Sequence, residues 1–236
     1  MKTPLLLLPG LMCDEAVWAP QLQALGDVAD VTVLDWGLRD SITAMAQHTL
    51  DSAPSGRFAL AGHSMGGRVA FEVLRLAPER VSRVALLDTG VQPLASGEAG
   101  EKERAGRMAL LHTARTQGMR AMGAQWAAGM VHPDQHQTPL FEAILQMIER
   151  SSPAQFAAQI QALLQRPDAA AVLATVRCPA LVLCGREDLW SPPAQHEALA
   201  RGMACAELVV LEHCGHMATL EQAEAVNQAL RRWLLA

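Results

Sequence analysis

Phe58-Ala-Leu-Ala-Gly-His-Ser-Met-Gly-Gly67 is the stretch of sequence that decides the fold. Its first four residues are apolar and predict a buried strand, and the residues after it are compatible with a helix as far as position 77. Between the two elements stands Gly62-His-Ser64-Met-Gly66, a Gly-x-Ser-x-Gly motif. This motif is typical of a nucleophile elbow, a strained turn that lifts a serine hydroxyl clear of a sheet edge. Glycines are needed there because side chains would collide with the strand and the helix.

The length and composition predict one substantial α/β domain. The chain has 236 residues, of which 50% are hydrophobic and 18% are charged. A net charge of −5, with no stretch rich in Lys and Arg, argues against a nucleic-acid partner. The apolar run near the start is interrupted by Pro9 and Gly10, so we interpret it as a first strand and not as a signal peptide. No apolar run has transmembrane length, so we expect no membrane association.

Cysteine and histidine spacing gives no indication of a metal site. The five cysteines are scattered and lack metal-ligand spacing, which favours free thiols in a reducing cytoplasm. His132 and His136 are four residues apart, but Pro133 disfavours the regular helix that a zinc pair would need. We therefore expect a cytoplasmic protein without a metal or cofactor. The sequence does not indicate its oligomeric state.

Short apolar runs alternate with helical patterns, which predicts a doubly wound, mostly parallel sheet of about six strands with helices on both faces. The runs are continuous, as expected for strands covered on both sides. The predicted strands are residues 4–8, 31–35, 58–62, 84–88, 180–184 and 208–211. The predicted helices are residues 42–52, with Asp40 or Ser41 as the N-cap, and residues 65–77, 196–201 and 221–235.

The regular alternation stops after Asp88. Residues 91–166 have a helical pattern throughout and contain no strand candidate. A helical block inserted into such a sheet is best interpreted as a cap over the carboxyl ends of the strands, where these folds bind ligands. We therefore predict a core of residues 1–90 and 167–236, with residues 91–166 as a helical cap or lid.

A serine nucleophile requires a base, and His216 is the best candidate. It lies in Glu-His-Cys-Gly-His-Met at residues 212–217, between the last predicted strand and the final helix, so its loop can return an imidazole to the sheet edge. His213 is the rival, but it lies closer to the strand end. His63 adjoins Ser64, and we expect its side chain to point away from the triad because neighbours along the elbow diverge.

The carboxylate that orients the base is best assigned to Asp188, directly after the penultimate predicted strand. The chain order is then Ser64, Asp188, His216, which is nucleophile, acid and base. Two alternatives remain. Asp88 follows the strand after the elbow and could also reach the base. Glu187 is adjacent to Asp188 but should face the opposite way.

A tetrahedral intermediate also needs hydrogen-bond donors for its oxyanion, typically two backbone amides. One is expected from Met65, directly after the nucleophile. The other is expected from the loop after the first strand, residues 9–14, and Leu11 is the best candidate. The residues that we expect to line the substrate pocket flank these motifs and are Met12, His63, Trp190 and Met217.

Taken together, these motifs resemble those of the α/β-hydrolase superfamily, in particular its small capped serine esterases. The match runs over the whole chain: Leu-Leu-Pro-Gly-Leu-Met-Cys-Asp at residues 7–14 with Trp18 after it, Gly-His-Ser-Met-Gly-Gly at 62–67, Ala-Pro-Glu-Arg-Val at 77–81, Gly-Arg-Glu-Asp at 185–188 and Cys-Gly-His-Met at 214–217. The resemblance implies Ser64, Asp188 and His216 as the triad, and Leu11 and Met65 as oxyanion donors.

The chain departs from the family pattern in two places. Many relatives carry His-Gly in the oxyanion loop, where this chain has Pro9-Gly10, so a polar side chain is missing beside the pocket. The domain also begins at the third strand of larger members, which implies the short sheet.

The sequence leads us to expect a serine hydrolase of carboxylic esters with a small, largely apolar substrate. The same triad could instead serve a carbon–carbon bond hydrolase, a peptidase, a lyase or synthase, or an acyltransferase, which fold analogy does not separate. A third possibility is a slow-turnover receptor for a small molecule or a signalling protein, for which the sequence gives no positive sign.

Overall fold

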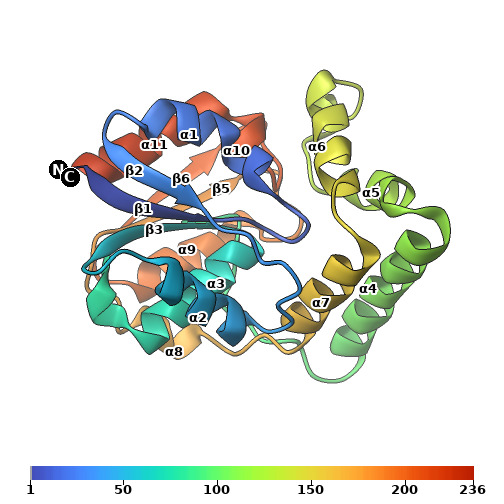
Figure 1. The fold of residues 1–236 in the computed structure, drawn as a ribbon, viewed down its shortest axis with the longest axis horizontal. Helices are drawn as coiled ribbons and strands as arrows, with labels where there is room; N and C mark the ends of the chain where they lie inside the picture. Colours follow the sequence, from blue (N-terminus) through green and yellow to red (C-terminus); the bar gives the residue numbers. More distant parts are fainter. Residues whose placement is uncertain (1) are drawn as a thin grey trace.

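A single six-stranded sheet organises the protein in the computed structural model, which describes residues 2–236 (Figure 1). Its strands are β1 (Thr3–Leu8), β2 (Ala29–Val33), β3 (Phe58–His63), β4 (Val81–Leu87), β5 (Ala180–Gly185) and β6 (Ala206–Leu211). They are arranged in the order β2-β1-β3-β4-β5-β6, and every pair is parallel. The predicted α/β class and strand number are confirmed.

Helices cover both faces of the sheet (Figure 1). On one face lie α1 (Ala19–Leu25), α10 (Ala218–Glu221) and α11 (Ala223–Leu235); on the other lie α2 (Ile42–Ser52), α3 (Met65–Leu76), α8 (Ala170–Leu173) and α9 (Pro193–Gly202). There are also three short 3₁₀ helices: Glu15–Trp18, Pro78–Arg80 and Pro133–Gln135. Ser41 is the N-cap of α2, because its Oγ accepts the amide of Ala44 at 3.0 Å.

The strands at the centre and at the edges of the sheet differ in burial. Every residue of β3 and of β5 is buried, as a continuous apolar strand between two helical layers requires. In contrast, exposed residues interrupt β2, and β6 is only partly buried. The expectation that all six strands are covered on both sides is therefore wrong for the two edge strands, each of which has a single neighbour.

Between β4 and β5 the chain forms a helical insert at the carboxyl ends of the strands (Figure 1). It consists of α4 (Glu98–Gln117), α5 (Met119–Ala127), α6 (Pro139–Glu149) and α7 (Pro153–Leu164), and residues 91–166 contain no strand. Ser152 and Gln155 form a capping box at the start of α7. The insert has the place expected of a cap; its division from the core at residues 91 and 166 stays a prediction.

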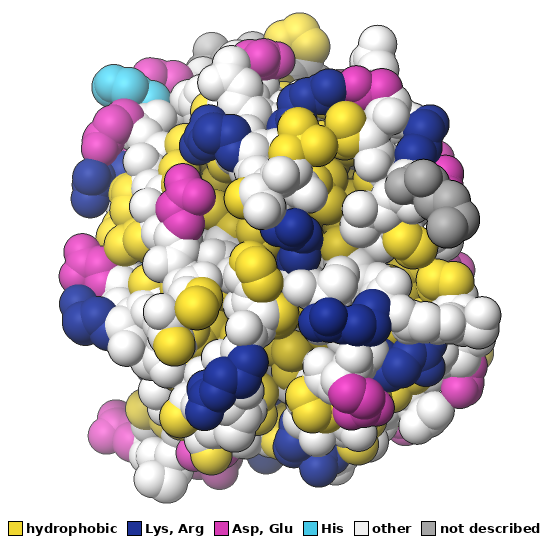
Figure 2. Space-filling view, turned by 90° about the vertical axis from the view of Figure 1, so that its left-hand side faces the viewer, with side chains coloured by type: hydrophobic (Ala, Val, Ile, Leu, Met, Phe, Trp, Pro, Cys, Tyr) yellow, Lys and Arg dark blue, Asp and Glu magenta, His cyan; other side chains and the backbone are white. Residues whose placement is uncertain are grey.

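Two further properties bear on possible partners. Within residues 2–236, no helix combines the length and the apolar character that crossing a membrane requires. On the face of the molecule opposite the insert, Lys and Arg side chains are interspersed with Asp and Glu (Figure 2). That face therefore carries no extended patch of a single charge.

Candidate active site

Ser64 lies at the sharp turn between β3 and α3, and its backbone is strained. Its φ is 54° and its ψ is −115°, a combination that residues with a side chain rarely adopt. A Cβ on Gly62 would overlap with the carbonyl of Gly66, and a Cβ on Gly66 would overlap with the carbonyl of Leu8. The Ser64 amide donates to Leu87 O at 2.9 Å and so ties the turn to β4. The two glycines of the motif are therefore required by close packing.

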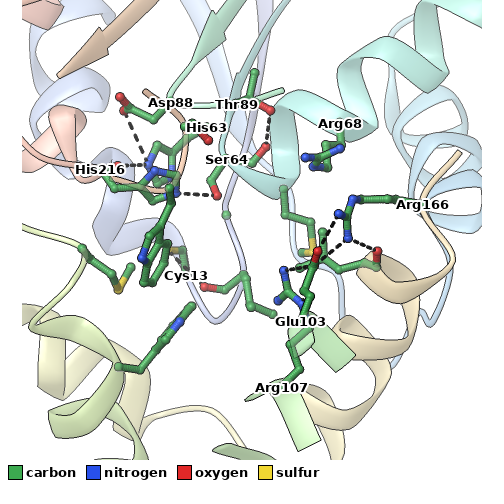
Figure 3. A pocket seen from close by; sticks show the side chains of 18 of the residues that line it. Cys13, His63, Ser64, Arg68, Asp88, Thr89, Glu103, Arg107, Arg166 and His216 are labelled. Atoms are coloured by element: carbon green, nitrogen blue, oxygen red, sulfur yellow. Dashed lines mark hydrogen bonds and ion pairs between the residues drawn. The ribbon is translucent and has the colours of Figure 1, made fainter. Parts of the chain in front are cut away.

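Ser64, His216 and Asp188 form one hydrogen-bonded chain (Figure 3 shows the first two). The distance from Ser64 Oγ to His216 Nε2 is 2.8 Å, and that from His216 Nδ1 to Asp188 Oδ2 is also 2.8 Å. The other carboxylate oxygen of Asp188 accepts the backbone amides of Trp190 and Ser191, both at 2.9 Å. The arrangement has the geometry of a catalytic triad.

The environment of Asp188 favours its charged form. Burial alone would raise the pKa of this carboxyl, but the His216 ring and the amides of Ser191 and Trp190 lower the pKa overall. The carboxylate is therefore available to stabilise a positive charge on His216 and to hold its ring in place.

The two alternative carboxylates make other contacts. Glu187 accepts the amide of Cys214 at 2.9 Å and so supports the loop that carries His216. Asp88 is fully buried at the end of β4 and accepts the amide of Gly185 at 3.1 Å. Burial, followed by the charge of Asp188, raises the pKa of Asp88 well above its ordinary value. Neither residue bonds to the His216 ring.

The two histidines that flank the site differ in their surroundings. His213 is exposed and packs edge-on against His132, with ring centroids 5.7 Å apart. His63 is fully buried, and its Nε2 donates to the carbonyl oxygen of His216 at 2.8 Å. Burial and the neighbouring His216 lower the pKa of His63 to about 3, so its ring is uncharged where it lies 3.7 Å from the Asp88 carboxyl. His63 therefore holds the backbone of His216.

The amides of Leu11 and Met65 flank the nucleophile. Leu11 follows Gly10, where an added Cβ would lie 3.2 Å from the Cβ of Ser64, so this loop passes directly beside the serine. Met65 begins α3. Among the hydrogen bonds of residues 2–236, none is donated by these two amides, and both residues line the cavity next to Ser64. Both are therefore available to an oxygen of a bound molecule.

Two residues that sequence reasoning missed hold the loops of the site. Glu221, at the end of α10, accepts the amides of His132 at 2.7 Å, Gly215 at 3.1 Å and Met217 at 3.0 Å. It joins the loop of His216 to the insert. Gln159 of α7 accepts the amide of Met12 at 2.8 Å and so ties the loop after β1 to the insert. Glu221 could have been found from the sequence, because it is an acidic residue shortly after the histidine motif. Nothing in the sequence indicated Gln159.

A cavity of about 470 Å³ opens over Ser64, between the sheet and the insert. Of the four residues expected to line it, His63 and Trp190 do so, whereas Met12 and Met217 are buried beside it. The cavity wall also includes charged residues that the sequence reasoning did not assign to the site: Arg68, Lys102, Glu103, Arg107 and Arg166. In the described part of the chain, no three His, Cys, Asp or Glu side chains are grouped so as to hold a metal ion.

Known proteins share this architecture. A thermophilic esterase from Thermogutta terrifontis, solved with malate bound, has a TM-score of 0.85 and 29% identity over 99% of this chain and 90% of its own. The dihydrolipoyllysine-residue acetyltransferase component of an acetoin cleaving system from Pseudomonas putida is 29% identical over 96% of this chain, which spans 58% of that protein. The 2-succinyl-6-hydroxy-2,4-cyclohexadiene-1-carboxylate synthase of Klebsiella pneumoniae subsp. pneumoniae is 28% identical over 89% of this chain and 79% of its own length.

These similarities agree with the sheet topology, with the strained serine turn and with the chain of hydrogen bonds that begins there. Residues 5–229 match the family model described as the alpha/beta hydrolase family. On this evidence, the chain belongs to the alpha/beta hydrolase family.

Proposed function

We propose that the protein is a serine hydrolase that cleaves carboxylic esters through a covalent acyl-enzyme. The observation that carries the proposal is the pair of 2.8 Å contacts that join Ser64 Oγ to His216 and His216 to Asp188, beneath a cavity large enough for a small molecule. The match to a thermophilic esterase over nearly the whole chain supports the ester as the substrate group.

In this proposal, Ser64 Oγ attacks the carbonyl carbon of the ester while His216 Nε2 takes the hydroxyl proton. Asp188 stabilises the resulting imidazolium, and the imidazolium then gives its proton to the departing alcohol. A water molecule, deprotonated by His216, attacks the acyl-enzyme. The acid is released, and the proton returns to Ser64.

The oxyanion of each tetrahedral intermediate would be held by the amides of Leu11 and Met65. What supports this is that both amides border the cavity beside Ser64 and are not used by other groups of residues 2–236. Pro9 removes one donor from the loop after β1 but leaves the Leu11 amide in place. Loss of one such donor typically lowers kcat by about a hundred- to a thousandfold.

The names of the relatives favour one competing use of the same residues. One is an acetyltransferase component, so transfer of the acyl group to an acceptor other than water is a second candidate for this chain. Adding thiols and alcohols to the assay separates the two reactions, because transfer gives a new thioester or ester whereas hydrolysis gives the free acid.

The test is labelling with a fluorophosphonate, read by intact mass, together with hydrolysis of p-nitrophenyl acetate and butyrate. The proteins are the wild type, Ser64→Ala, His216→Ala and Asp188→Asn, with Ser55→Ala as a control at an exposed serine. We expect stoichiometric labelling of the wild type and of Ser55→Ala that is lost in Ser64→Ala, and a collapse of turnover in the three triad variants but not in Ser55→Ala. A folded wild type that neither labels nor turns over would overturn the proposal.

A further inference from the structure

Three arginines gather at the end of the cavity farthest from His216 (Figure 3). Arg68 belongs to α3, Arg107 to α4, and Arg166 follows α7. In Figure 3 the guanidinium groups of Arg107 and Arg166 contact the carboxylate of Glu103, that of Arg68 lies farther from this carboxylate, and Ser64 lies between this cluster and His216. The core and the insert thus both contribute cations to one wall of the cavity.

The charges of this cluster do not cancel. Glu103 contacts Arg166 at 2.7 Å and Arg107 at 2.9 Å, and it is the cluster's carboxylate. Three guanidinium groups against one carboxylate leave two positive charges in excess, and Lys102 adds a third on the same wall. The other acidic residue of the cavity wall is Asp88, which lies beside His63 on the opposite side of Ser64 from the arginines (Figure 3). This end of the cavity is therefore positively charged.

Arg166 uses its hydrogen-bond donors within the protein. Its Nε donates to Gln92 O at 3.1 Å, its Nη1 to Glu103 and to Leu163 O, and its Nη2 to Glu103 and to Pro93 O. These bonds join the end of α7 to α4 and to the segment after β4. The role of Arg166 is therefore to join the two ends of the insert and to hold the carboxylate of Glu103 in place.

Arg68 is different. In residues 2–236 it donates to Gln92 O at 2.8 Å, and no carboxylate lies within ion-pair distance of its guanidinium. Burial, followed by the charge of Arg166, lowers the pKa of Arg68 to about 9. A guanidinium that is partly removed from water, lies near another cation and has no carboxylate within ion-pair distance is unfavourable by itself. A bound anion would offset this cost and would use the Nε and Nη2 donors.

The position of Arg68 relates this anion to the reaction. Arg68 stands one turn after Ser64 along α3, and its amide contacts Ser64 O at 3.4 Å. One helical turn is about 5.4 Å, and both Arg68 and Ser64 line the same cavity. A single small molecule can therefore reach both groups. Arg107 lies on the same wall, and Glu103 uses only one edge of its guanidinium.

We propose that this arginine cluster binds a carboxylate of the substrate, so that the protein acts on small esters or lactones that carry a free carboxylate, such as half-esters of short dicarboxylic acids. The planar guanidinium of Arg68 matches a carboxylate in a bidentate arrangement, with Arg107 as the second cation. The proposal rests on the proposed hydrolase function, and it replaces the expectation of an uncharged, largely apolar substrate.

The test compares a charged ester with its neutral counterpart. For the wild type, kcat/KM is measured for the monoethyl esters of succinate, glutarate and adipate and for the three corresponding diethyl esters, by pH-stat. O-Acetylglycolate and its ethyl ester extend the comparison to a carboxylate on the alcohol side. The variants are Arg68→Gln and Arg68→Lys, and the matched control is Arg104→Gln, an exposed arginine of α4 outside the cavity wall.

We expect the wild type to prefer at least one charged ester over its neutral counterpart. Arg68→Gln should lower the ratio of the two kcat/KM values about 10- to 100-fold, Arg68→Lys by less, and Arg104→Gln should leave the ratio unchanged. Calorimetric titration of the Ser64→Ala protein with glutarate should detect binding that is lost when Arg68→Gln is added.

Two negative results have different meanings. If the wild type hydrolyses the neutral esters but prefers no charged one, or if Arg68→Gln leaves the ratio unchanged, the carboxylate proposal is wrong and the hydrolase function stands. If the folded wild type hydrolyses none of the esters and is not labelled by a fluorophosphonate, the proposed function itself is wrong.

Discussion

The strained backbone of Ser64 predicts that glycine at this position will give a more stable protein than alanine. The backbone of Ser64, with a φ of 54° and a ψ of −115°, lies in a region that residues with a Cβ rarely adopt. Glycine has no Cβ and adopts this region without that steric cost. Ser64→Ala keeps the Cβ and therefore the strain, but loses the 2.8 Å bond to His216 Nε2. Ser64→Gly loses the same bond and the strain as well. The difference in stability between these two variants therefore isolates the backbone contribution.

The expected difference follows from two opposing contributions. A residue held in a sparsely populated backbone region costs about 1–3 kcal/mol. Glycine loses more backbone freedom on folding than alanine does, which costs about 0.5–1 kcal/mol. Ser64→Gly should therefore be more stable than Ser64→Ala by about 1 kcal/mol, which corresponds to about 2–4 °C in Tm for a chain of this size.

The assay is equilibrium unfolding in urea, followed by circular dichroism, with calorimetry for Tm. A control pair at an ordinary backbone position should give the opposite sign: Ala53 has a φ of −74°, so Ala53→Gly should destabilise the protein. Both Ser64 variants should be inactive. If Ser64→Gly is no more stable than Ser64→Ala while Ala53→Gly behaves as expected, the turn does not store strain and the reasoning is refuted.

Three further changes test the surroundings of the triad. Asp88 keeps its proton in the folded protein over a pH range in which the unfolded chain loses it, so the contribution of Asp88 to stability should fall as pH rises from about 4, by up to about 1.4 kcal/mol per pH unit. Asp88→Asn cannot ionise, so its urea-unfolding stability relative to wild type should rise between pH 4 and pH 7; a constant difference would contradict this. Glu221→Gln replaces an acceptor oxygen by a donor opposite several amides, and it should lower stability by about 1–3 kcal/mol in urea and also lower kcat for p-nitrophenyl acetate. Gly66→Ala would force a Cβ onto the Leu8 carbonyl, and we expect loss of soluble folded protein in expression trials, in contrast to Gly106→Ala, where the added Cβ meets open space.

The order of the elements could be predicted because glycine, proline and apolar runs mark it along the chain. The strand before Ser64, the helix after it and the helix of residues 42–52 were placed to within one residue. Errors occurred where tertiary packing sets the boundary. The edge strands β2 and β6 each begin two residues before the predicted start, because pairing with one neighbouring strand extends them into less apolar residues. The final predicted helix is divided at Gln222, whose φ of −128° separates α10 from α11.

The triad could be proposed from sequence because parallel strands bring their carboxyl ends to one edge. Each of Ser64, Asp188 and His216 follows a strand, so chain position alone predicts that they meet there. Which carboxylate faces the histidine is a different question, because Asp88 and Asp188 both end strands at that edge. Burial and the charge of Asp188 raise the pKa of Asp88, whereas the His216 ring and two amides favour the anion of Asp188.

The arginine cluster could not be predicted from the sequence, because its three arginines are far apart along the chain. Its members come from the elbow helix, from the first helix of the insert and from the end of the last one, and no window of the sequence contains two of them. The net charge of −5, which argues against a nucleic-acid partner, gave no sign of this cluster either. Net charge describes the whole surface, however, whereas exposed charges are screened over about 8 Å at physiological salt. A molecule at Ser64 therefore interacts with the guanidinium groups around the cavity far more strongly than with the distant carboxylates that dominate the total.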